Sequence, residues 1–533
     1  MRRHRWSFAI ALGLIVTVVP SVAPPVSAQG HPDRSIPGVG TVTWGPCTDE
    51  TLVAFGAECG MLSVPLDYRR PKGEKIQIAV SRMQHTVPDE EYQGIMLVNP
   101  GGPGGSGLIY SVLRDLVPGG AGAAYDWIGF DPRGVGSSVP ALSCDPDYMA
   151  GPRPRYEPTS PWIEGAWLWR SVGYARDCGQ AGGRLLSHLK TTDNVADMDA
   201  IRQALGERQI NFYGFSYGTY LGQVYATLHP ERVRRMVLDA NVDPRQVWYD
   251  ANIDQDYAFE VVIQIFFDWV ARHDDTYGLG GTADEVEAAY YAALEQLAAS
   301  PQGALGASEW ADAFLGAGYA QFLWPETADA FAAFVNGGDP GPATDLYLGQ
   351  DTPGDDNGYA MYLATECTDA KWPRNWKTWH RDNTEVAEDA PFFTWGNAWF
   401  NAPCAFWPAK SGTPVNVKGR WAPPILLFSE TLDAATPFEG SLEVRKRFPA
   451  SALVATEGGT THANTIFGGV QCADEALAAY LIDGTMPARQ PGRVADVTCE
   501  AAPEPEPVTL TAATTARTAV TADLVRLLHP QTR

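Results

Sequence analysis

The chain has 533 residues, of which 39 are Lys or Arg and 63 are Asp or Glu, so its formal net charge is −24 at pH 7. A surface of this sign repels phosphate backbones and acidic lipid headgroups, and neither nucleic acid nor a membrane is expected as a partner. A cationic or N-terminally charged ligand is tolerated. Solubility outside the cell is a sufficient explanation of the charge and the favoured one, so the charge does not identify a substrate.

The first 28 residues have the pattern of a secretory signal peptide. Three arginines stand among the first five residues, residues 8–19 are almost wholly apolar, and residues 24–28 end in a small-x-small cleavage pattern. The apolar run is short for a membrane span, and no later stretch is apolar enough to be one. We therefore expect cleavage after about Ala28, secretion to the outside of the cell, and a flexible lead-in or prosegment over residues 29–40.

Short apolar runs separated by helical stretches predict a mostly parallel sheet with crossover helices, which is an α/β fold. Residues 59–68 and 75–80 are expected as strands near a sheet edge. The remaining expected strands are 94–98, 126–130, 210–213, 233–238, 424–428 and 452–455. They place a catalytic core in two parts of the chain, at residues 41–243 and 409–500.

A glycine-rich segment, N-P-G-G-P-G-G-S-G at residues 99–107, follows the strand expected at 94–98. Glycines allow backbone N–H groups to approach a ligand closely. The segment contains no lysine and no G-x-x-x-x-G-K-[ST] pattern, which argues against a phosphate loop. We expect Gly102 to supply one N–H group of an oxyanion hole, and Tyr217, described next, to supply the other.

Residues 214–218 have the sequence G-F-S-Y-G, which is a G-x-S-x-G motif. An apolar run precedes the motif and a segment of helical character follows it. This strand–turn–helix context is typical of a nucleophile elbow, in which a sharp turn exposes Ser216 at the top of a parallel sheet. The motif alone often occurs by chance, but in this context and with suitable partners it indicates a serine hydrolase.

The middle of the chain, residues 244–408, is helical and rich in aromatic residues, and it predicts an inserted cap. Helices are expected at 258–270, 284–297 and 327–334. Ten of the 17 tryptophans lie here: Trp248, Trp269, Trp310, Trp324, Trp372, Trp376, Trp379, Trp395, Trp399 and Trp407. Packing is the favoured role for any one of them, with pocket lining as the alternative. A C-terminal tail, residues 501–533, starts with an extended P-E-P-E-P run and ends in a helical segment, 522–528.

A serine nucleophile needs a base to accept its proton, and the base needs a carboxylate to orient it. In this class of enzyme the order along the chain is Ser, acid, His. Asp433 follows the strand expected at 424–428 and is the predicted acid, with Glu430 as the runner-up. His462 lies in a glycine-rich loop after the strand expected at 452–455, and outside the tail it is the only histidine that satisfies this order.

Eight cysteines without a C-x-x-C pair, in an exported chain, indicate disulfides rather than a metal site. Spacing does not determine connectivity, but sequence neighbours suggest the pairs Cys47–Cys59, Cys144–Cys178, Cys367–Cys404 and Cys472–Cys499. The chain contains no H-E-x-x-H motif and no clustered ligands. We therefore expect no metal and no cofactor.

These motifs together resemble a known family. They are the glycine-rich segment at 99–107, F-D-P-R-G-V-G-S-S at 130–138, G-F-S-Y-G-T at 214–219, Asp433 with the Thr-Pro pair after it, and His462. They are similar to the secreted tripeptidyl aminopeptidases of actinobacterial type, in the prolyl-aminopeptidase branch of the α/β-hydrolases, with their TAP-like C-terminal region. The resemblance covers roughly residues 44–499. Thr461 departs from the glycine that precedes the base in many relatives.

The resemblance implies an α/β-hydrolase core with a helical cap that cleaves short peptides, by family type tripeptides, from a free N-terminus. It also implies acidic groups for the substrate ammonium, for which Glu366 and Asp369 are the candidates. The alternative is that these two residues only solvate a helix end. Arg133 is expected to fix loops around the site.

Two other functions remain open. The same triad would serve an esterase or a tailoring hydrolase acting on a small natural product, which would need no acidic anchor. A non-catalytic binding protein on a hydrolase scaffold is the alternative from another class, because fold alone does not determine function. The intact serine, acid, histidine and glycine loop favour an enzyme. We expect it to act as a monomer on a peptide substrate with a free N-terminus.

Overall fold

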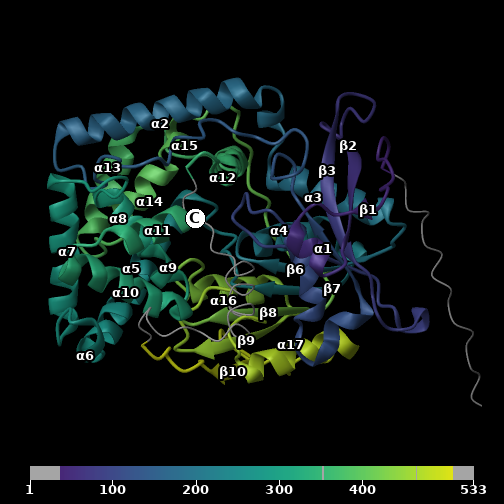
Figure 1. Cartoon of the computed structure of the whole chain (residues 1–533). Coiled ribbons are helices and arrows are strands. Elements are labelled where there is room, and N and C mark those ends of the chain that lie inside the picture. The colour runs from purple at the N-terminus through teal and green to yellow at the C-terminus, as the bar shows by residue number, and fades with distance from the viewer. Residues whose placement is uncertain (1–35, 351–352, 464, 508–533) are drawn as a thin grey trace, which may run out of the picture. The chain divides into compact units, whose positions relative to one another are not determined.

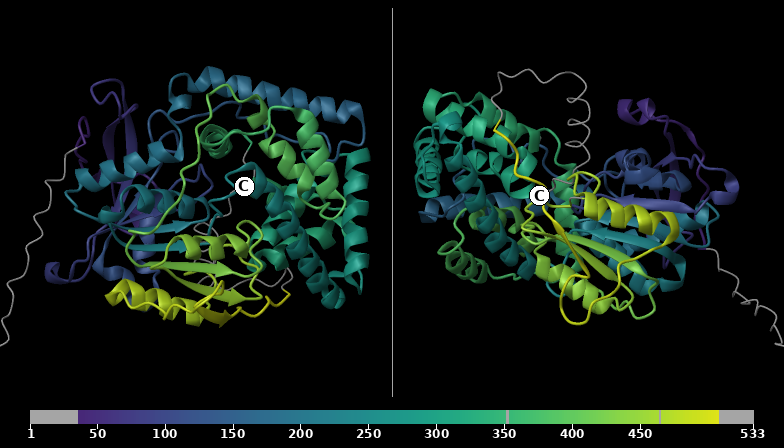
Figure 2. Two further views of the ribbon diagram at one scale, coloured as in Figure 1. Left: turned by 180° about the vertical axis from the view of Figure 1, so that it is seen from behind. Right: turned by 90° about the horizontal axis from the view of Figure 1, so that it is seen from below.

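The computed structural model describes residues 36–350, 353–463 and 465–507. The predicted signal peptide, most of the predicted lead-in and the helix expected at 522–528 lie outside these ranges. The described residues form a sheet and a region of helices at one end of its strands (Figures 1 and 2). In the part of the chain that is described, no helix is both long and apolar enough to cross a membrane.

Ten strands form one sheet in the order β1-β2-β3-β5-β4-β6-β7-β8-β9-β10. The strands at the β1 edge pair antiparallel, and all pairs from β5 to β10 are parallel. Their bounds are β1 (Gly45–Pro46), β2 (Glu58–Pro65), β3 (Lys75–Met83), β4 (Ile95–Asn99), β5 (Asp126–Phe130), β6 (Ile210–Phe215), β7 (Val233–Asp239), β8 (Ile425–Glu430), β9 (Ala452–Glu457) and β10 (Val497–Glu500). The predicted α/β class with a mostly parallel sheet is confirmed. Only the short edge strands β1 and β10 were not predicted.

Successive residues of the central strands are buried on opposite faces of the sheet, as the two-residue period of a strand requires. On β4, for example, Ile95 and Leu97 belong to one buried cluster and Met96 and Val98 to another. The first cluster includes α3 (Thr191–Ala204), α4 (Tyr217–Leu228) and α16 (Phe438–Arg447), and the second includes α17 (Gln471–Asp483). The sheet is therefore a middle layer between two layers of helices, which explains why its strands are continuous apolar runs.

Between β7 and β8 the chain leaves the sheet and builds the helical region, which has an apolar core of its own. The expected helices at 258–270, 284–297 and 327–334 lie inside α5, α7 and α10. The helices of the region are α5 (Tyr249–Arg272), α6 (Asp274–Tyr277), α7 (Ala283–Ala299), α8 (Ala307–Ala313), α9 (Leu315–Tyr319), α10 (Trp324–Gly337), α11 (Gly341–Gln350), α12 (Asn357–Asp369), α13 (Trp376–Ala387), α14 (Thr394–Asn401) and α15 (Pro403–Phe406). Most of its tryptophans are buried among these helices.

Helix α2 (Pro161–Gly182) departs from the domain boundaries that the sequence suggests. It falls within the stretch assigned to the core, 41–243, yet its N-terminal half packs against the helical region. The rings of Trp167 and Trp399 stack with centroids 5.8 Å apart, and Glu164 accepts a hydrogen bond from Trp376 Nε1 at 2.7 Å. Figure 1 shows α2 running along the top of the molecule, from the helical region toward α3. The helix therefore bridges the two parts.

Four disulfides are present, and they join the pairs that sequence neighbours suggested. Cys47–Cys59 ties the segment before α1 (Glu50–Ala54) to β2, and Cys472–Cys499 ties α17 to β10. Cys144–Cys178 anchors α2, and Cys367–Cys404 joins α12 to α15. Each link reduces the conformational freedom of the unfolded chain and so favours the folded state.

The start of the predicted tail also packs on the helical region. Trp269 Nε1 of α5 donates to the carbonyl oxygen of Pro505 at 3.1 Å, and Arg272 forms an ion pair with Glu504 at 2.7 Å. The amide of Gln321 lies 3.3 Å from the carbonyl oxygen of Pro503. The chain thus returns from β10 to the helices that were inserted before β8.

Candidate active site

Ser216 occupies the turn between β6 and α4 with φ 53° and ψ −127°. A positive φ is unfavourable for a residue with a side chain, and this strain is held by the packing around it. The backbone N–H of Ser216 donates to the carbonyl oxygen of Asp239 at 3.0 Å. Both glycines of the motif are required because the backbone of other residues lies too close for a side chain. A Cβ at Gly214 would lie 2.5 Å from the carbonyl oxygen of Gly218, and one at Gly218 would lie 2.5 Å from that of Asn99.

We expect Gly218→Ala to destabilise the protein, because the obstructing atom is a backbone oxygen and cannot move aside cheaply. Overpacking of this kind costs about 1–3 kcal/mol. Thermal unfolding measures the loss. The control is Gly165→Ala on α2, where an added Cβ meets no atom within 4 Å and a glycine-to-alanine change inside a helix stabilises by about 0.5–1 kcal/mol. Equal melting temperatures for the two variants would contradict the packing argument.

His462 and Asp433 form a buried pair. Nδ1 of His462 lies 2.9 Å from each carboxylate oxygen of Asp433. The carboxylate also accepts hydrogen bonds from the backbone N–H groups of Ala435 and Thr436, both at 2.9 Å, and from the Thr436 hydroxyl at 2.8 Å. Since a carboxylate is an acceptor, it holds the proton on Nδ1 and leaves Nε2 with its lone pair. Among the described residues, nothing hydrogen-bonds to Nε2, which is buried.

His462 lies beside the pocket that contains Ser216. Its backbone N–H donates to the carbonyl oxygen of Tyr319 at 2.7 Å, and its Nδ1 lies 3.4 Å from the Thr436 hydroxyl. Tyr319 and Thr436 both line the pocket together with Ser216. The runner-up acid, Glu430, accepts a hydrogen bond from the backbone N–H of Thr461 instead. Of the two candidate acids, Asp433 therefore contacts the imidazole ring of His462, and Glu430 binds the backbone of the loop that carries His462.

The glycine-rich segment after β4 comes close to the nucleophile. A Cβ at Gly101 would lie 2.7 Å from Cβ of Ser216, and φ at Gly101 is 109°. Asn99 Oδ1 accepts a hydrogen bond from the Gly101 N–H at 3.1 Å and holds the segment in place. Gly102 and Tyr217, the predicted oxyanion donors, both line the pocket beside Ser216. This tight approach requires glycine, because any side chain at position 101 would collide with the serine.

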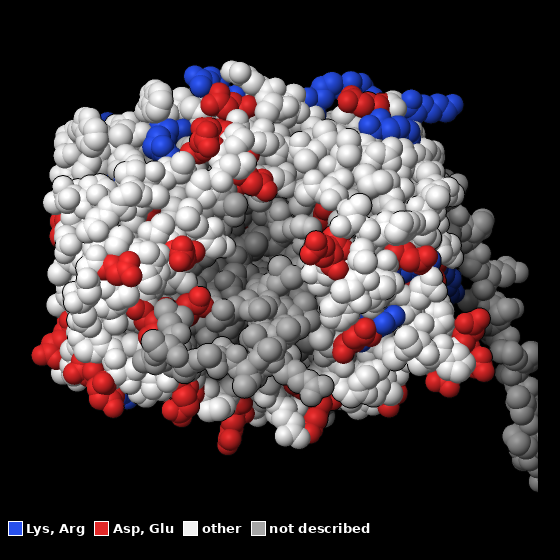
Figure 3. Space-filling model, viewed as in Figure 1, with Lys and Arg blue, Asp and Glu red and all other residues white. Residues whose placement is uncertain are grey.

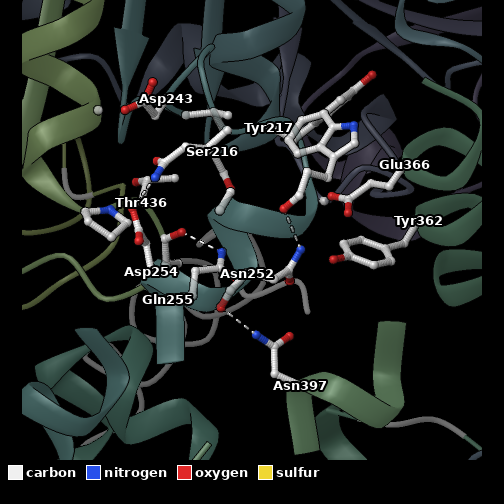
Figure 4. A pocket seen from close by; sticks show the side chains of 18 of the residues that line it. Ser216, Tyr217, Asp243, Asn252, Asp254, Gln255, Tyr362, Glu366, Asn397 and Thr436 are labelled. Atoms are coloured by element: carbon white, nitrogen blue, oxygen red, sulfur yellow. Dashed lines mark hydrogen bonds between the residues drawn. The ribbon is translucent and has the colours of Figure 1, made fainter. Parts of the chain in front are cut away.

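The pocket beside Ser216 encloses about 840 Å³, including the solvent at its mouth. Its walls come from the carboxyl ends of the strands and from four helices of the helical region (Figure 4). One of them, α9, contributes Tyr319. α5 contributes Asn252, Asp254 and Gln255, α12 contributes Tyr362 and Glu366, and α14 contributes Asn397 and Phe400. A substrate that reaches Ser216 therefore contacts the sheet and the helical region at once.

Glu366 is buried in the wall of this pocket, and its Oε2 has no hydrogen-bond partner among the described residues. Burial raises the pKa of Glu366 well above its ordinary value, while hydrogen bonds with Tyr362 and Asn252 partly offset the rise. Figure 4 shows Glu366 beside Tyr362, across from Asn252. A buried carboxyl group with one oxygen left without a partner gains a strong one when a cation enters the pocket.

Asp369, the other candidate for the substrate ammonium, lies outside the pocket lining. Its carboxylate accepts hydrogen bonds from the backbone N–H of Thr191 at 2.8 Å and from the Thr191 hydroxyl at 2.5 Å. That hydroxyl is in turn 2.7 Å from the hydroxyl of Tyr217. The structure thus places the Asp369 carboxylate on Thr191 and Glu366 in the pocket wall, although both residues belong to α12. Asp369 links α12 to the residue next to the nucleophile.

Asp369 is expected to make stability fall as the pH rises. Burial raises its pKa from 3.8 to about 7 in the folded protein, against the opposing effect of the Thr191 hydrogen bonds. Because the folded state binds this proton more tightly than the unfolded state, the stabilising contribution is complete below about pH 4 and is lost as the pH rises through about 7. Thermal unfolding between pH 4.5 and 8 should show the wild type losing stability relative to Asp369→Asn. Parallel curves would contradict this assignment.

The sequence did not point to several polar residues in the pocket wall and directly behind it. Asn252, Asn397 and Asn401 form a buried amide network, in which Asn397 Nδ2 donates to the Asn252 carbonyl oxygen at 3.0 Å and Asn401 Nδ2 donates to Asn252 Oδ1 at 3.0 Å. The available signal was two asparagines four residues apart in a helix of mostly aromatic and small residues. Buried amides cost free energy unless they are paired, so their presence marks a polar interior.

Arg133, expected to fix loops around the site, is buried and paired with Asp197, with Nε 2.6 Å from the carboxylate. It also donates to backbone carbonyl oxygens of Leu66 and His188. It therefore holds the loop after β5 against α3 and the segment before it. In the described part of the chain, no group of three or more His, Cys, Asp or Glu side chains is placed to hold a metal ion.

Fold and pocket together define a serine hydrolase. The model of the alpha/beta hydrolase fold family matches residues 94–463, and the chain belongs to that family. The tripeptidyl aminopeptidase of Streptomyces lividans is 41% identical over 482 residues, covering 87% of this chain and 88% of that protein. The serine protease Hip1 of Mycobacterium tuberculosis is 32% identical over 90% of this chain and 96% of its own length. Carboxylesterase B of the same species is 32% identical over 91% of this chain and 97% of its own length.

Proposed function

We propose that this protein is a secreted serine exopeptidase that releases tripeptides from the free N-termini of peptides. The observation that carries the proposal is the buried carboxyl group of Glu366, which has an unpartnered oxygen in the pocket that contains Ser216. It provides a site for the terminal ammonium group and so positions the peptide relative to the nucleophile. The similarity to a tripeptidyl aminopeptidase supports release of three residues at a time.

The residues of the site suit an acyl-enzyme mechanism. Ser216 attacks the scissile carbonyl and passes its proton to Nε2 of His462, whose imidazolium form the Asp433 carboxylate stabilises. The backbone N–H groups of Gly102 and Tyr217 bind the oxyanion of the tetrahedral intermediate. Protonated His462 then donates its proton to the leaving amine. Water, deprotonated by His462, hydrolyses the ester on Ser216 and restores the enzyme.

Secretion is part of the proposal and is supported by two features. The first 28 residues have the composition of a signal peptide. The eight cysteines form four disulfides, which persist in oxidising surroundings outside the cytoplasm. One chain supplies every residue named in the site, and the proposed active form is a monomer.

A matched series of chromogenic amides tests the peptidase function. It contains p-nitroanilides of one, two and three residues with a free amine, and the tripeptide again with an acetylated amine. The free tripeptide should be cleaved fastest, and acetylation should lower kcat/KM about 10²-fold, because it removes the cation that pairs with Glu366. Glu366→Gln should lower kcat/KM for the free tripeptide by a similar factor while leaving the acetylated substrate nearly unaffected. Indifference to acetylation would overturn the exopeptidase proposal.

The second candidate is an esterase that uses the same triad, and the similarity to a carboxylesterase favours it. A p-nitrophenyl acyl ester without an amine separates the two functions in the same assay. An esterase would cleave this ester far faster than any of the amides and would be insensitive to Glu366→Gln. We expect the opposite order, because an ammonium anchor has no use in the hydrolysis of such an ester.

A further inference from the structure

The pocket has a second acidic side. Asp243 and Asp254 lie on one side of Ser216, while Glu366 and Tyr362 lie on the other (Figure 4). Both aspartates line the pocket, as does Glu439 at the start of α16. A ligand that spans Ser216 from Glu366 therefore extends toward these carboxylates.

Two of the three carboxylates already have a basic partner. Asp243 is paired with Arg245, whose Nε lies 3.0 Å from each carboxylate oxygen. Glu439 is paired with Arg493. Asp254 instead accepts a hydrogen bond from the neutral amide of Gln246 at 2.6 Å. Within residues 36–350, 353–463 and 465–507 it forms no ion pair with Lys or Arg, so it is the carboxylate whose charge is left for a ligand.

The surroundings of Asp254 disfavour its negative charge. Partial burial raises the pKa of Asp254, and the hydrogen bond from Gln246 lowers it. The like charges of Asp243 and Asp250 raise it further, and the positive charge of Arg245, which is paired with Asp243, lowers it. Below the upper edge of the face shown in Figure 3, most of the charged side chains are acidic, with a few basic ones among them. A carboxylate held among like charges gains more from a cation than an isolated one does, because the cation relieves their repulsion.

We propose that Asp254 selects peptides with a lysine or arginine side chain immediately after the scissile bond. This inference rests on the proposed function, since the substrate ammonium at Glu366 and the scissile carbonyl at Ser216 set the direction of the chain. The departing peptide then lies on the side of Ser216 that Asp254 and Thr436 line. The buried, unpartnered oxygen of Glu366 is the independent observation that fixes this direction. The preferred substrates are thus peptides with a basic residue at the new N-terminus.

The test uses three peptides with one common N-terminal tripeptide and one common tail, which differ only in having Lys, Gln or Glu after the scissile bond. Tripeptide release is followed by chromatography and mass spectrometry, and kcat/KM is compared within each enzyme variant. The wild type should prefer Lys over Glu by about tenfold or more, with Gln between them, the size expected for one attractive and one repulsive exposed charge pair. In Asp254→Asn this preference should fall about fivefold or more.

Asp250→Asn is the matched control, because it removes the same charge from the same helix at a residue outside the pocket lining. It should change the Lys-to-Glu preference less than twofold. The tripeptide p-nitroanilide, which lacks a side chain after the scissile bond, shows that each variant is folded and active. A wild type indifferent to Lys, Gln and Glu, or an Asp254→Asn variant that keeps the preference, would overturn the role of Asp254 and leave the exopeptidase function standing. Absence of tripeptide release from all three peptides would overturn both.

Discussion

Replacement of Ser216 by alanine is expected to lower kcat about 10⁶-fold, which is the scale of loss when a triad serine is removed. Ser216 stands on the strained turn between β6 and α4 and lines the pocket. Hydrolysis of the free tripeptide p-nitroanilide measures the loss. The activity that remains reflects binding and the oxyanion site, as is usual for triad variants.

This variant should fold normally, because serine to alanine removes one oxygen and adds no volume. Its thermal unfolding and near-ultraviolet circular dichroism should match those of the wild type. It should also fail to form a covalent adduct with a fluorophosphonate probe, which the wild type forms. A folded Ser216→Ala protein that retains more than a few per cent of wild-type activity would overturn the assignment of the nucleophile.

Replacement of Asp433 by asparagine is expected to lower kcat about 10⁴-fold. The amide group can donate to Nδ1 of His462 and so stabilises the tautomer whose proton is on Nε2, which cannot accept a proton from Ser216. In the wild type the carboxylate lies 2.9 Å from Nδ1 and fixes the opposite tautomer. Steady-state kinetics on the tripeptide p-nitroanilide should show the loss in kcat with little change in KM.

Glu430→Gln separates the two candidate acids. Glu430 accepts a hydrogen bond from the backbone N–H of Thr461, whereas Asp433 holds Nδ1 of His462. An amide at position 430 keeps one acceptor oxygen and should retain kcat within about tenfold of the wild type. A loss as large as that of Asp433→Asn would show that Glu430 takes part in orienting the base. The pair of variants also controls for the removal of one buried carboxylate near β8.

Most strands of the sheet and the positions of the three triad candidates could be predicted from the sequence, because they depend on local patterns. Buried parallel strands are short apolar runs, and the G-x-S-x-G motif with an apolar run before it is visible in the sequence around Ser216. The placement of Asp433 and His462 followed from their positions after two such runs. Glu366 was suggested by family resemblance, and its side chain does face the pocket.

The remaining features depend on contacts between distant segments. Asp369 stands three residues after Glu366 on α12, and only the packing of that helix decides that one carboxylate enters the pocket while the other turns to Thr191. Asp254 is an ordinary polar residue in the sequence of α5, and its place opposite Glu366 comes from how that helix is set against the sheet. For the same reason the sequence did not predict that α2 bridges the two parts of the protein. This helix lies between two strands of the core in the chain, but it packs against α14 in the folded structure.

The insertion between β7 and β8 also affects how the protein acquires activity. These strands are hydrogen-bonded neighbours, with Met236 opposite Ile425. The helical region therefore connects them as one long loop, whose two ends come together when the strands pair. The entropy of closing a loop grows only slowly with its length, so the insertion adds little to the equilibrium cost of folding. Pairing of segments so distant in the chain is nevertheless slow. Ser216 precedes the insertion, whereas Asp433 and His462 follow it. During synthesis the nucleophile therefore emerges long before its base, and peptide hydrolysis begins only when the last third of the sheet has docked.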